Sequence, residues 1–186
     1  MSLPEVLQRI AAALDRAEVA YMLTGSFASA YYGVPRSTQD IDLVIAGTTA
    51  QLRKFVEGLP SNKYYADTET ALEAHQRESM FNVIDLASGW KIDMIIRKSR
   101  EFSQEEFKRR RQVNLQGVQL FVASAEDVII SKLEWAKRAQ SQRQIEDAAG
   151  IMKMQDASLD RSYVEKWVRE LNLTQEWDGA QCQATS

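Results

Sequence analysis

The sequence predicts an α+β fold: a small mixed β-sheet with flanking helices, followed by a helical segment from about residue 124. Short apolar segments bounded by turns recur through the first 123 residues, which is typical of strands. Some of these segments form a hairpin and others are joined through a helix, so the sheet should be mixed and not all parallel. From Ser124 onward, apolar residues recur at helical spacing.

The N-terminal region predicts a helix, a strand and a second, short helix. Residues 3–17 carry an apolar stripe at helical period, and Ser2 and Glu5 have the spacing of a capping box. An apolar strand over residues 19–24 ends at Gly25 and Ser26. A helix over about residues 27–32 follows, and the break around Pro35 ends it.

The middle of the chain supplies most of the predicted sheet. A strand from residue 40 to 45 precedes a helix over 48–59, and residues 62–66 are a further candidate strand. Residues 68–78 form a short helix or an ordered loop, and residues 80–86 and 90–96 pair as a hairpin. A helix over 102–111 opens at Ser103, and residues 113–123 give one or two strands around Gly117.

Three helices are expected in the second half of the chain, over residues 125–140, 142–154 and 162–171. Ser124 and Asp127 lie near the spacing of a capping box at the first of them. From Asn172 the chain is polar and small, and we expect it to fray. The predicted organisation is therefore a domain over residues 1–123, a helical segment over 124–173 packed on it, and a polar tail over 174–186.

The composition limits the class of protein. The 186 residues carry a net charge of −3, which argues against a generally basic nucleic-acid binder but allows a local basic patch. The single cysteine, Cys182, excludes a disulfide framework within the chain. No apolar run approaches the ~20 residues of a membrane-spanning helix, and the N-terminus lacks the pattern of a signal peptide. We therefore expect a cytoplasmic enzyme without a membrane partner.

Acidic residues in apolar strands are the main sign of chemistry. Asp40 and Asp42 lie two apart in a strand, so both carboxylates point to one face. Asp93 lies in another apolar run, where a lone charge is costly unless it is paired or bound to metal. If the two strands are neighbours, three carboxylates converge, and such oxygen ligands suit Mg²⁺. Asp85 competes with Asp93 as the third acid, and the pattern around Asp93 favours the latter.

A phosphate site is expected next to this acid pair. The helix that follows Gly25 and Ser26 offers backbone N–H groups and a positive dipole end, and glycine allows close approach of a ligand. Arg36 and Thr38 precede the acid pair and are candidate phosphate ligands, since arginine suits bidentate phosphate contact, and a solvated loop cation is the alternative for Arg36. His75, the only histidine, is expected to be a surface or partly buried residue without a catalytic role.

The ordered set of Gly25-Ser26, Asp40-Ile41-Asp42 and Asp93 resembles the nucleotidyltransferase superfamily related to DNA polymerase beta. The resemblance implies a nucleotidyltransferase palm in which the Gly-Ser turn holds the phosphates of the nucleotide. It also implies that Asp40 and Asp42 ligate metal. Asp93 would complete the metal site and help to deprotonate the attacking hydroxyl.

Two segments of the second half resemble the AbiEii-type abortive-infection toxin nucleotidyltransferases and their uncharacterised relatives. They are Ser131-Lys132-Leu133 and Arg143-Gln-Ile-Glu146-Asp147. The resemblance implies that Lys132 reaches the nucleotide phosphates and that Asp147 lies nearby. Glu146 departs from the pattern, which often has lysine there. The resemblance also implies a tRNA or other RNA acceptor and a companion antitoxin protein.

The sequence thus predicts Mg²⁺-dependent transfer of a nucleoside monophosphate from an NTP to an acceptor hydroxyl, with RNA as the favoured acceptor. The basic run from Lys108 to Arg111 could contact RNA phosphates or form a solvated helix end. Two alternatives stay open. The acceptor could be a small hydroxyl compound such as an aminoglycoside, or the protein could be a catalytically silent nucleotide-binding or regulatory protein.

Overall fold

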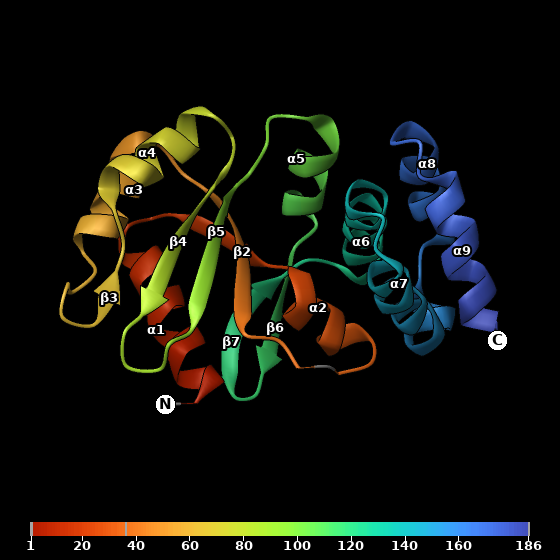
Figure 1. Ribbon diagram of the computed structural model, residues 1–186, viewed down its shortest axis with the longest axis horizontal. Coiled ribbons are helices and arrows are strands. Elements are labelled where there is room, and N and C mark those ends of the chain that lie inside the picture. The colour runs from red at the N-terminus through yellow and green to blue at the C-terminus, as the bar shows by residue number, and fades with distance from the viewer. Residues whose placement is uncertain (1, 36, 186) are drawn as a thin grey trace. The chain divides into compact units, whose positions relative to one another are not determined.

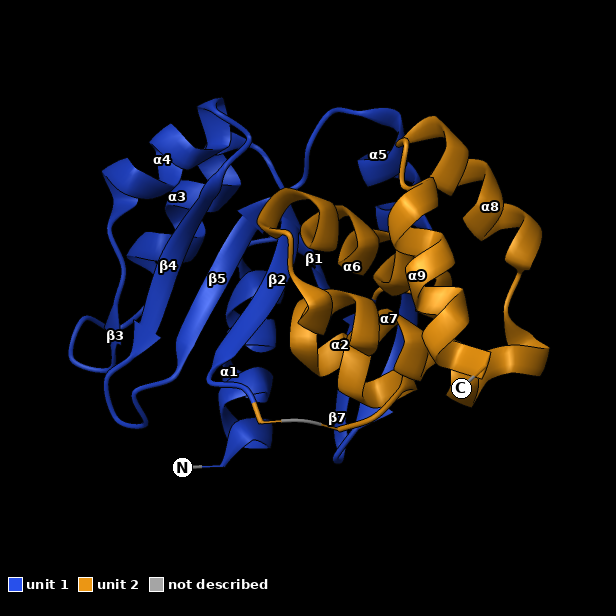
Figure 2. Ribbon diagram, turned by 45° about the vertical axis from the view of Figure 1, so that its right-hand side comes forward, with its two compact units in different colours: residues 1–24, 38–122 blue, residues 25–37, 123–186 orange. Residues whose placement is uncertain are grey.

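The computed structural model describes residues 2–35 and 37–185, so Arg36, a predicted nucleotide ligand, lies outside the described residues. The chain divides into two compact units (Figure 2). Unit 1 contains residues 1–24 and 38–122, and unit 2 contains residues 25–37 and 123–186. The predicted boundary after residue 123 lies one residue from the point where the chain leaves unit 1 for the last time, but residues 25–37 belong to the unit that contains the C-terminal helices.

Unit 1 is built on a mixed sheet, as the sequence predicts (Figure 1). Within the described residues the sheet has seven strands in the order β3-β4-β5-β2-β1-β7-β6. The neighbours β2/β5 and β1/β7 are parallel and the other pairs are antiparallel. The strands are β1 (Ala20–Leu23), β2 (Asp40–Ala46), β3 (Tyr64–Tyr65), β4 (Met80–Asp85), β5 (Lys91–Ile96), β6 (Arg111–Leu115) and β7 (Val118–Val122).

The helices that precede β4 in the chain of unit 1 cover one face of this sheet (Figure 1). Helix α1 (Leu3–Arg16) packs on β1 and β7, and the Ser2 N–H donates to the Glu5 carboxylate at 2.8 Å, as in the predicted capping box. Helix α3 (Thr49–Glu57) contacts α1 and α4 (Thr68–Gln76), and α4 contacts β4. The core on this face comes from alternate strand residues, which include Leu23, Ile41, Leu43, Ile45, Phe81, Val83, Ile92, Met94 and Ile96.

Two segments of unit 1 differ from or sharpen the sequence prediction. Residues 68–76 form a helix, because the Asp67 carboxylate accepts the Thr70 N–H at 2.7 Å and caps its first turn. Helix α5 (Glu101–Lys108) begins two residues before the predicted start at Ser103. It also ends earlier than predicted, because Arg111 already begins β6 and pairs with Val122.

Unit 2 is helical. It contains α2 (Gly25–Tyr32), α6 (Ala125–Ala139), α7 (Gln142–Gln155), the 3-10 turn η1 (Asp156–Ser158), α8 (Arg161–Glu170) and α9 (Thr174–Thr185). Helix α2 packs on α6 and α7. A Cβ on Gly33 would lie 3.0 Å from the backbone nitrogen of Ile151, so glycine is what lets the end of α2 approach α7 this closely. This approach explains why residues 25–37 join the C-terminal helices.

The start of α6 confirms the predicted cap. The Ser124 hydroxyl accepts the backbone N–H of Asp127 at 3.2 Å and donates to the Asp127 carboxylate at 2.6 Å. Asp127 is fully buried, and its second oxygen accepts the hydroxyl of Tyr163 from α8 at 2.7 Å. The buried carboxylate is thus fully hydrogen-bonded, as burial of a charge requires.

The C-terminal tail was predicted to fray, and this prediction is wrong. Residues 174–185 form α9, which packs on α7. Leu173, Trp177 and Ala180 are all buried and recur at helical spacing, so they form a narrow apolar stripe in an otherwise polar segment. The Trp177 N–H donates to the Leu173 carbonyl at 2.9 Å and continues the helical pattern.

Trp177→Ala should therefore destabilise the protein. The indole is 6% exposed, and its removal leaves a cavity under α9 that lowers the free energy of unfolding by about 3 kcal/mol. Trp135→Ala is the matched control, because Trp135 is 55% exposed and its loss should cost less than about 0.5 kcal/mol. Urea unfolding of the two variants measures the difference, and equal losses would contradict a structural role for α9.

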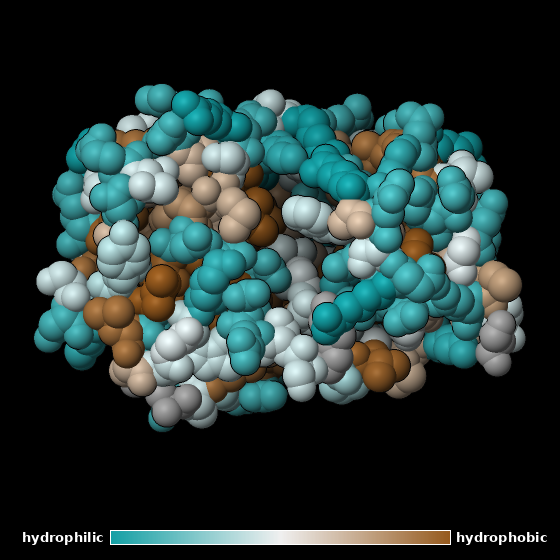
Figure 3. Space-filling model, viewed as in Figure 1, coloured by the Kyte–Doolittle hydropathy of each residue, from teal (hydrophilic) through white to brown (hydrophobic). Residues whose placement is uncertain are grey.

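The surface is mainly hydrophilic on the face that Figure 3 shows, with hydrophobic residues in smaller groups. On unit 1, the exposed apolar side chains include Tyr65, Met80 and Leu86 on or beside β3 and β4. Across the part of the chain that the structure describes, no helix combines the length and apolarity needed to cross a membrane.

Candidate active site

The three predicted acids lie on one face of the sheet in unit 1. Strands β2 and β5 are parallel neighbours, which is the condition under which the three acids were expected to converge, and Asp42 lies directly opposite Asp93 in their register. Asp40 lies two residues before Asp42 and therefore points to the same face. This face is opposite to the one that Ile41, Leu43 and Ile45 bury. We call Asp40, Asp42 and Asp93 the acid cluster.

A lysine that the sequence analysis missed lies among these acids. Lys91 is opposite Asp40 in the register. Its Nζ lies 3.1 Å and 3.2 Å from the two carboxylate oxygens of Asp93, and 3.8 Å from Oδ1 of Asp40. Asn82, on β4, is opposite Asp93 and donates from Nδ2 to its Oδ1 at 2.6 Å.

The acids hold Lys91 in its charged form. The hydrogen bond with Asp93 raises the pKa of the Lys91 ammonium above its usual value, and the negative charges of Asp93, Asp40 and Asp42 add to this effect. Partial burial acts in the opposite direction and is outweighed. All three acids therefore stabilise the positive charge of Lys91.

The donors of the acid cluster have the right chemistry for Mg²⁺, but they are not arranged as a complete metal site. Among residues 2–35 and 37–185, no group of three or more His, Cys, Asp or Glu side chains is placed to hold a metal ion. Mg²⁺ is commonly bound by one or two carboxylates together with waters and substrate phosphates. The facing carboxylates of Asp42 and Asp93 fit that smaller set.

Asp85, the alternative third acid, lies on the opposite face. Side chains alternate between the two faces of a strand, and Asp85 lies three residues after Asn82, which is on the face of the acid cluster. Asp85 therefore points to the other face, toward α1. It is 1% exposed and pairs with the guanidinium of Arg9, and it also accepts the backbone N–H groups of Ala87 and Ser88 at 3.1 Å and 3.0 Å. Asp85 thus stabilises the hairpin turn and is not part of the acid cluster.

Arg9→Met should destabilise the protein, because it leaves the buried Asp85 carboxylate with backbone donors alone. The loss of a charged hydrogen bond predicts a free energy of unfolding lower by about 2 kcal/mol. Arg16→Met, at an exposed position of the same helix, is the control and should have little effect. Chemical unfolding of both variants measures this. An unchanged midpoint for Arg9→Met would show that Asp85 does not need its partner.

The predicted phosphate ligands are divided between the two units. Gly25 opens α2 in unit 2 with a backbone φ of +63°, a conformation that favours glycine, and Ser26 follows it. Thr38 is in unit 1, and its hydroxyl donates a hydrogen bond to the Asp40 carbonyl at 3.4 Å. The Thr24 N–H donates to the Asp42 carbonyl at 2.9 Å, and the chain passes from there directly into α2.

Lys132 and Asp147 form a buried ion pair within unit 2. Lys132 on α6 donates from Nζ to Oδ2 of Asp147 on α7 at 2.7 Å. Their side chains are only 5% and 9% exposed. Asp147 therefore lies near Lys132, as the resemblance implies.

Comparison with known proteins decides the family. The model of a family described as nucleotidyltransferase of unknown function (DUF6036) matches residues 1–178. The chain belongs to this nucleotidyltransferase family. A search of curated proteins found no match. The AbiEii-type resemblance has no support in these findings and stays a prediction.

Solved structures share the fold of this nucleotidyltransferase. The antibiotic-resistance factor ANT(2'')-Ia aligns with a TM-score of 0.56 and 15% identity over 90% of each chain. The lincosamide antibiotic adenylyltransferase LnuA, solved with lincomycin, aligns with a TM-score of 0.56 and 12% identity over 83% of this chain and 98% of its own. An antigenic nucleotidyltransferase-like protein from Paracoccidioides brasiliensis aligns with a TM-score of 0.54 and 16% identity over 98% of this chain and 92% of its own. Identities this low establish the fold alone.

The basic run of the nucleotidyltransferase is partly used in packing. Arg110 lies over the rings of Phe107 and Phe121, at 4.4 Å and 5.1 Å from their centroids, and donates to the Phe107 carbonyl at 2.7 Å. Burial, with a smaller contribution from the charge of Arg97, lowers the pKa of Arg110. Lys108 and Arg111 are exposed. His75 is half-buried, as predicted, with Nε2 3.0 Å from the Gly47 carbonyl.

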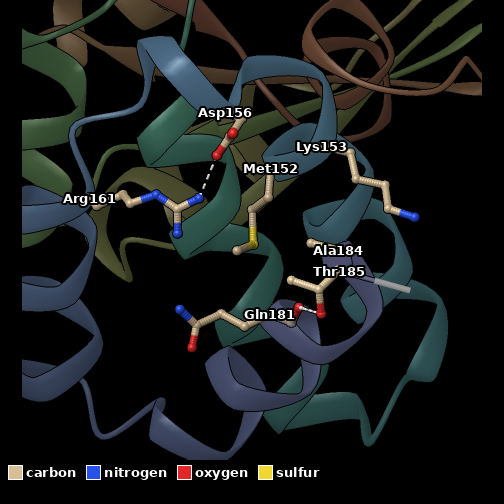
Figure 4. A pocket seen from close by; sticks show the side chains of 7 residues that line it. All are labelled: Met152, Lys153, Asp156, Arg161, Gln181, Ala184 and Thr185. Atoms are coloured by element: carbon tan, nitrogen blue, oxygen red, sulfur yellow. Dashed lines mark hydrogen bonds and ion pairs between the residues drawn. The ribbon is translucent and has the colours of Figure 1, made fainter.

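A cavity of about 250 Å³ lies between the C-terminal helices of the nucleotidyltransferase (Figure 4). Arg161 and Asp156 pair across 2.6 Å at its edge, and α9 contributes Gln181, Ala184 and Thr185 to its lining. The residues found to line it include none of the predicted site residues, so the cavity adds nothing to the candidate site.

Proposed function

We propose that this nucleotidyltransferase moves a nucleoside monophosphate from an NTP to an acceptor hydroxyl in a Mg²⁺-dependent reaction that releases pyrophosphate. The observation that carries the proposal is the register that sets Asp42 opposite Asp93, with Asp40 on the same face. Carboxylates on adjacent parallel strands supply the hard oxygen ligands that a magnesium nucleotide needs.

Each acid has a proposed role. Asp40 and Asp42 are metal ligands, and Asp93 completes the metal set and takes the proton of the acceptor hydroxyl. Bound Mg²⁺ would supply charge neutralisation of the phosphates. The acceptor oxygen forms a bond to the α-phosphorus while the bond to the β-phosphate oxygen breaks, so the leaving electron pair departs with pyrophosphate.

The remaining predicted residues act on the nucleotide in this proposal. Gly25 and Ser26 hold phosphate through backbone N–H groups at the start of α2 and through the serine hydroxyl. Arg36 and Thr38 are further nucleotide ligands. Lys132 neutralises triphosphate charge, and Asp147 holds the lysine side chain in place for that task, as their 2.7 Å contact supports.

RNA, and tRNA in particular, is the acceptor that the resemblance of Lys132 and Asp147 to the toxin-like branch favours, together with an antitoxin partner. The reaction consumes NTP, which suits the cytoplasmic location expected from the sequence. Exposed Lys108 and Arg111 are the members of the basic run that could contact RNA phosphates.

A small hydroxyl compound is the second candidate acceptor. It is favoured by the fold shared with ANT(2'')-Ia and with LnuA, which are an antibiotic-resistance factor and an antibiotic adenylyltransferase. An aminoglycoside or a lincosamide would present hydroxyl groups for the same chemistry.

Labelled nucleotides test the proposal and separate the acceptors. The purified protein is incubated with Mg²⁺ and each α-³²P-NTP, with total tRNA in one set of reactions and aminoglycosides or lincosamides in another. Label in RNA supports the first acceptor, and label in the small compound supports the second. NTP binding without transfer to any acceptor, including the protein itself, would favour the silent nucleotide-binding alternative and contradict the proposal.

A further inference from the structure

Lys91 has no part in the proposed reaction, yet it lies at the centre of the acid cluster. Its Nζ contacts both carboxylate oxygens of Asp93, at 3.1 Å and 3.2 Å, and lies 3.8 Å from Asp40. The strand register places Lys91 on the face of the acid cluster, because Lys91 is paired with Asp40 and lies two residues before Asp93. One ammonium therefore faces three negative charges.

This contact competes with metal binding. The ammonium contacts both carboxylate oxygens of Asp93, the atoms that would ligate a divalent cation, and Asn82 also donates to Oδ1 at 2.6 Å. Two cations a few ångströms apart repel each other, so close contact of the ammonium with Asp93 disfavours a metal ion on the same carboxylate. Without either cation, the three carboxylates would repel one another.

We propose that Lys91 is a positioning residue that serves as an internal counter-ion of the acid cluster. It holds the carboxylates together in the metal-free protein and opposes the entry of a divalent cation. The inference rests on the proposed function, since it takes the acid cluster as the metal site. Lys91 leaves the Asp93 carboxylate when the cation binds, so it sets the cation concentration at which the site fills.

Direct cation binding tests this role without any measurement of activity. Mn²⁺ binding to the full chain is followed by electron paramagnetic resonance for wild type, Lys91→Met and Lys91→Gln, two neutral variants. Both should bind Mn²⁺ about tenfold more tightly, because a unit charge that repels a divalent ion at this range is worth at least that factor. Lys91→Arg keeps the charge and should restore an affinity close to that of wild type. Lys63→Met, at an exposed position of unit 1, is the control for loss of a lysine.

Thermal unfolding gives the second readout. In EDTA, Lys91→Met should unfold at a lower temperature than wild type, and saturating Mn²⁺ should remove most of that difference. Unchanged or weaker Mn²⁺ affinity in both neutral variants would overturn the counter-ion role. Asp42→Asn separates the two claims: if it binds Mn²⁺ as wild type does, the acid cluster is not the metal site and the proposed function fails. If Asp42→Asn loses Mn²⁺ while the Lys91 variants behave as wild type, the counter-ion role alone fails.

Discussion

Asp42→Asn should reduce nucleotidyl transfer roughly a thousandfold, the loss expected when one element of transition-state charge stabilisation is removed. The amide keeps the shape of the side chain but loses the charge that a metal ligand needs. Asp42 is partly buried at the surface of the sheet, with its main chain held by Thr24, so the fold should persist. Steady-state rates with α-³²P-NTP, measured alongside the unfolding midpoint, check both expectations.

The control for this variant is Asp15→Asn, the same chemical change at an exposed position of α1. It should transfer nucleotide at the wild-type rate. Wild-type activity in Asp42→Asn would show that the acid cluster has no role in the reaction. An equal loss of transfer rate in Asp15→Asn would show that the change in net charge, and not the loss of a metal ligand, slows the reaction.

Lys132→Met should have a large effect on stability as well as on transfer. It leaves the Asp147 carboxylate buried without its cation, which predicts a free energy of unfolding lower by about 3 kcal/mol. The loss of a fixed positive charge should also slow transfer by about a hundredfold. Unfolding in urea and the transfer assay measure the two effects separately.

A double variant separates structure from chemistry at this pair. Lys132→Met combined with Asp147→Leu replaces both charges by apolar groups and should recover most of the lost stability. Transfer should stay low, because the lysine is still absent. Lys137→Met, an exposed lysine of the same helix that donates to the Asn172 carbonyl, is the control and should be close to wild type. A stable double variant with full activity would exclude Lys132 from the reaction.

The acid cluster could be predicted because its signal is local. A period of two places Asp40 and Asp42 on one face, and the apolar residues around Asp93 require a buried strand. The same period of two also predicts that Lys91, two residues before Asp93, lies on the face of the acids, and the sequence analysis did not use this. The apolar pattern around Asp93 already favoured it over Asp85. That Asp85 lies on the other face follows only from the strand register, which depends on pairing between separate segments.

Other features depend on packing that no local pattern shows. The grouping of α2 with the C-terminal helices follows from the close approach of Gly33 to the Ile151 backbone, which are far apart in sequence. Helix α9 was missed because Leu173, Trp177 and Ala180 are few apolar residues in a polar segment, and their burial against neighbouring helices outweighs the polar composition.

A crystal structure with Mn²⁺ and a non-reactive NTP analogue tests the central claim most directly, because the anomalous signal of manganese locates the cation. The account predicts manganese bound by carboxylate oxygens of Asp40, Asp42 and Asp93 and by a phosphate oxygen, with the Lys91 ammonium moved away from Asp93. Manganese and phosphates at another place, with Lys91 still on Asp93, would contradict the assignment of the acid cluster as the metal site of nucleotidyl transfer.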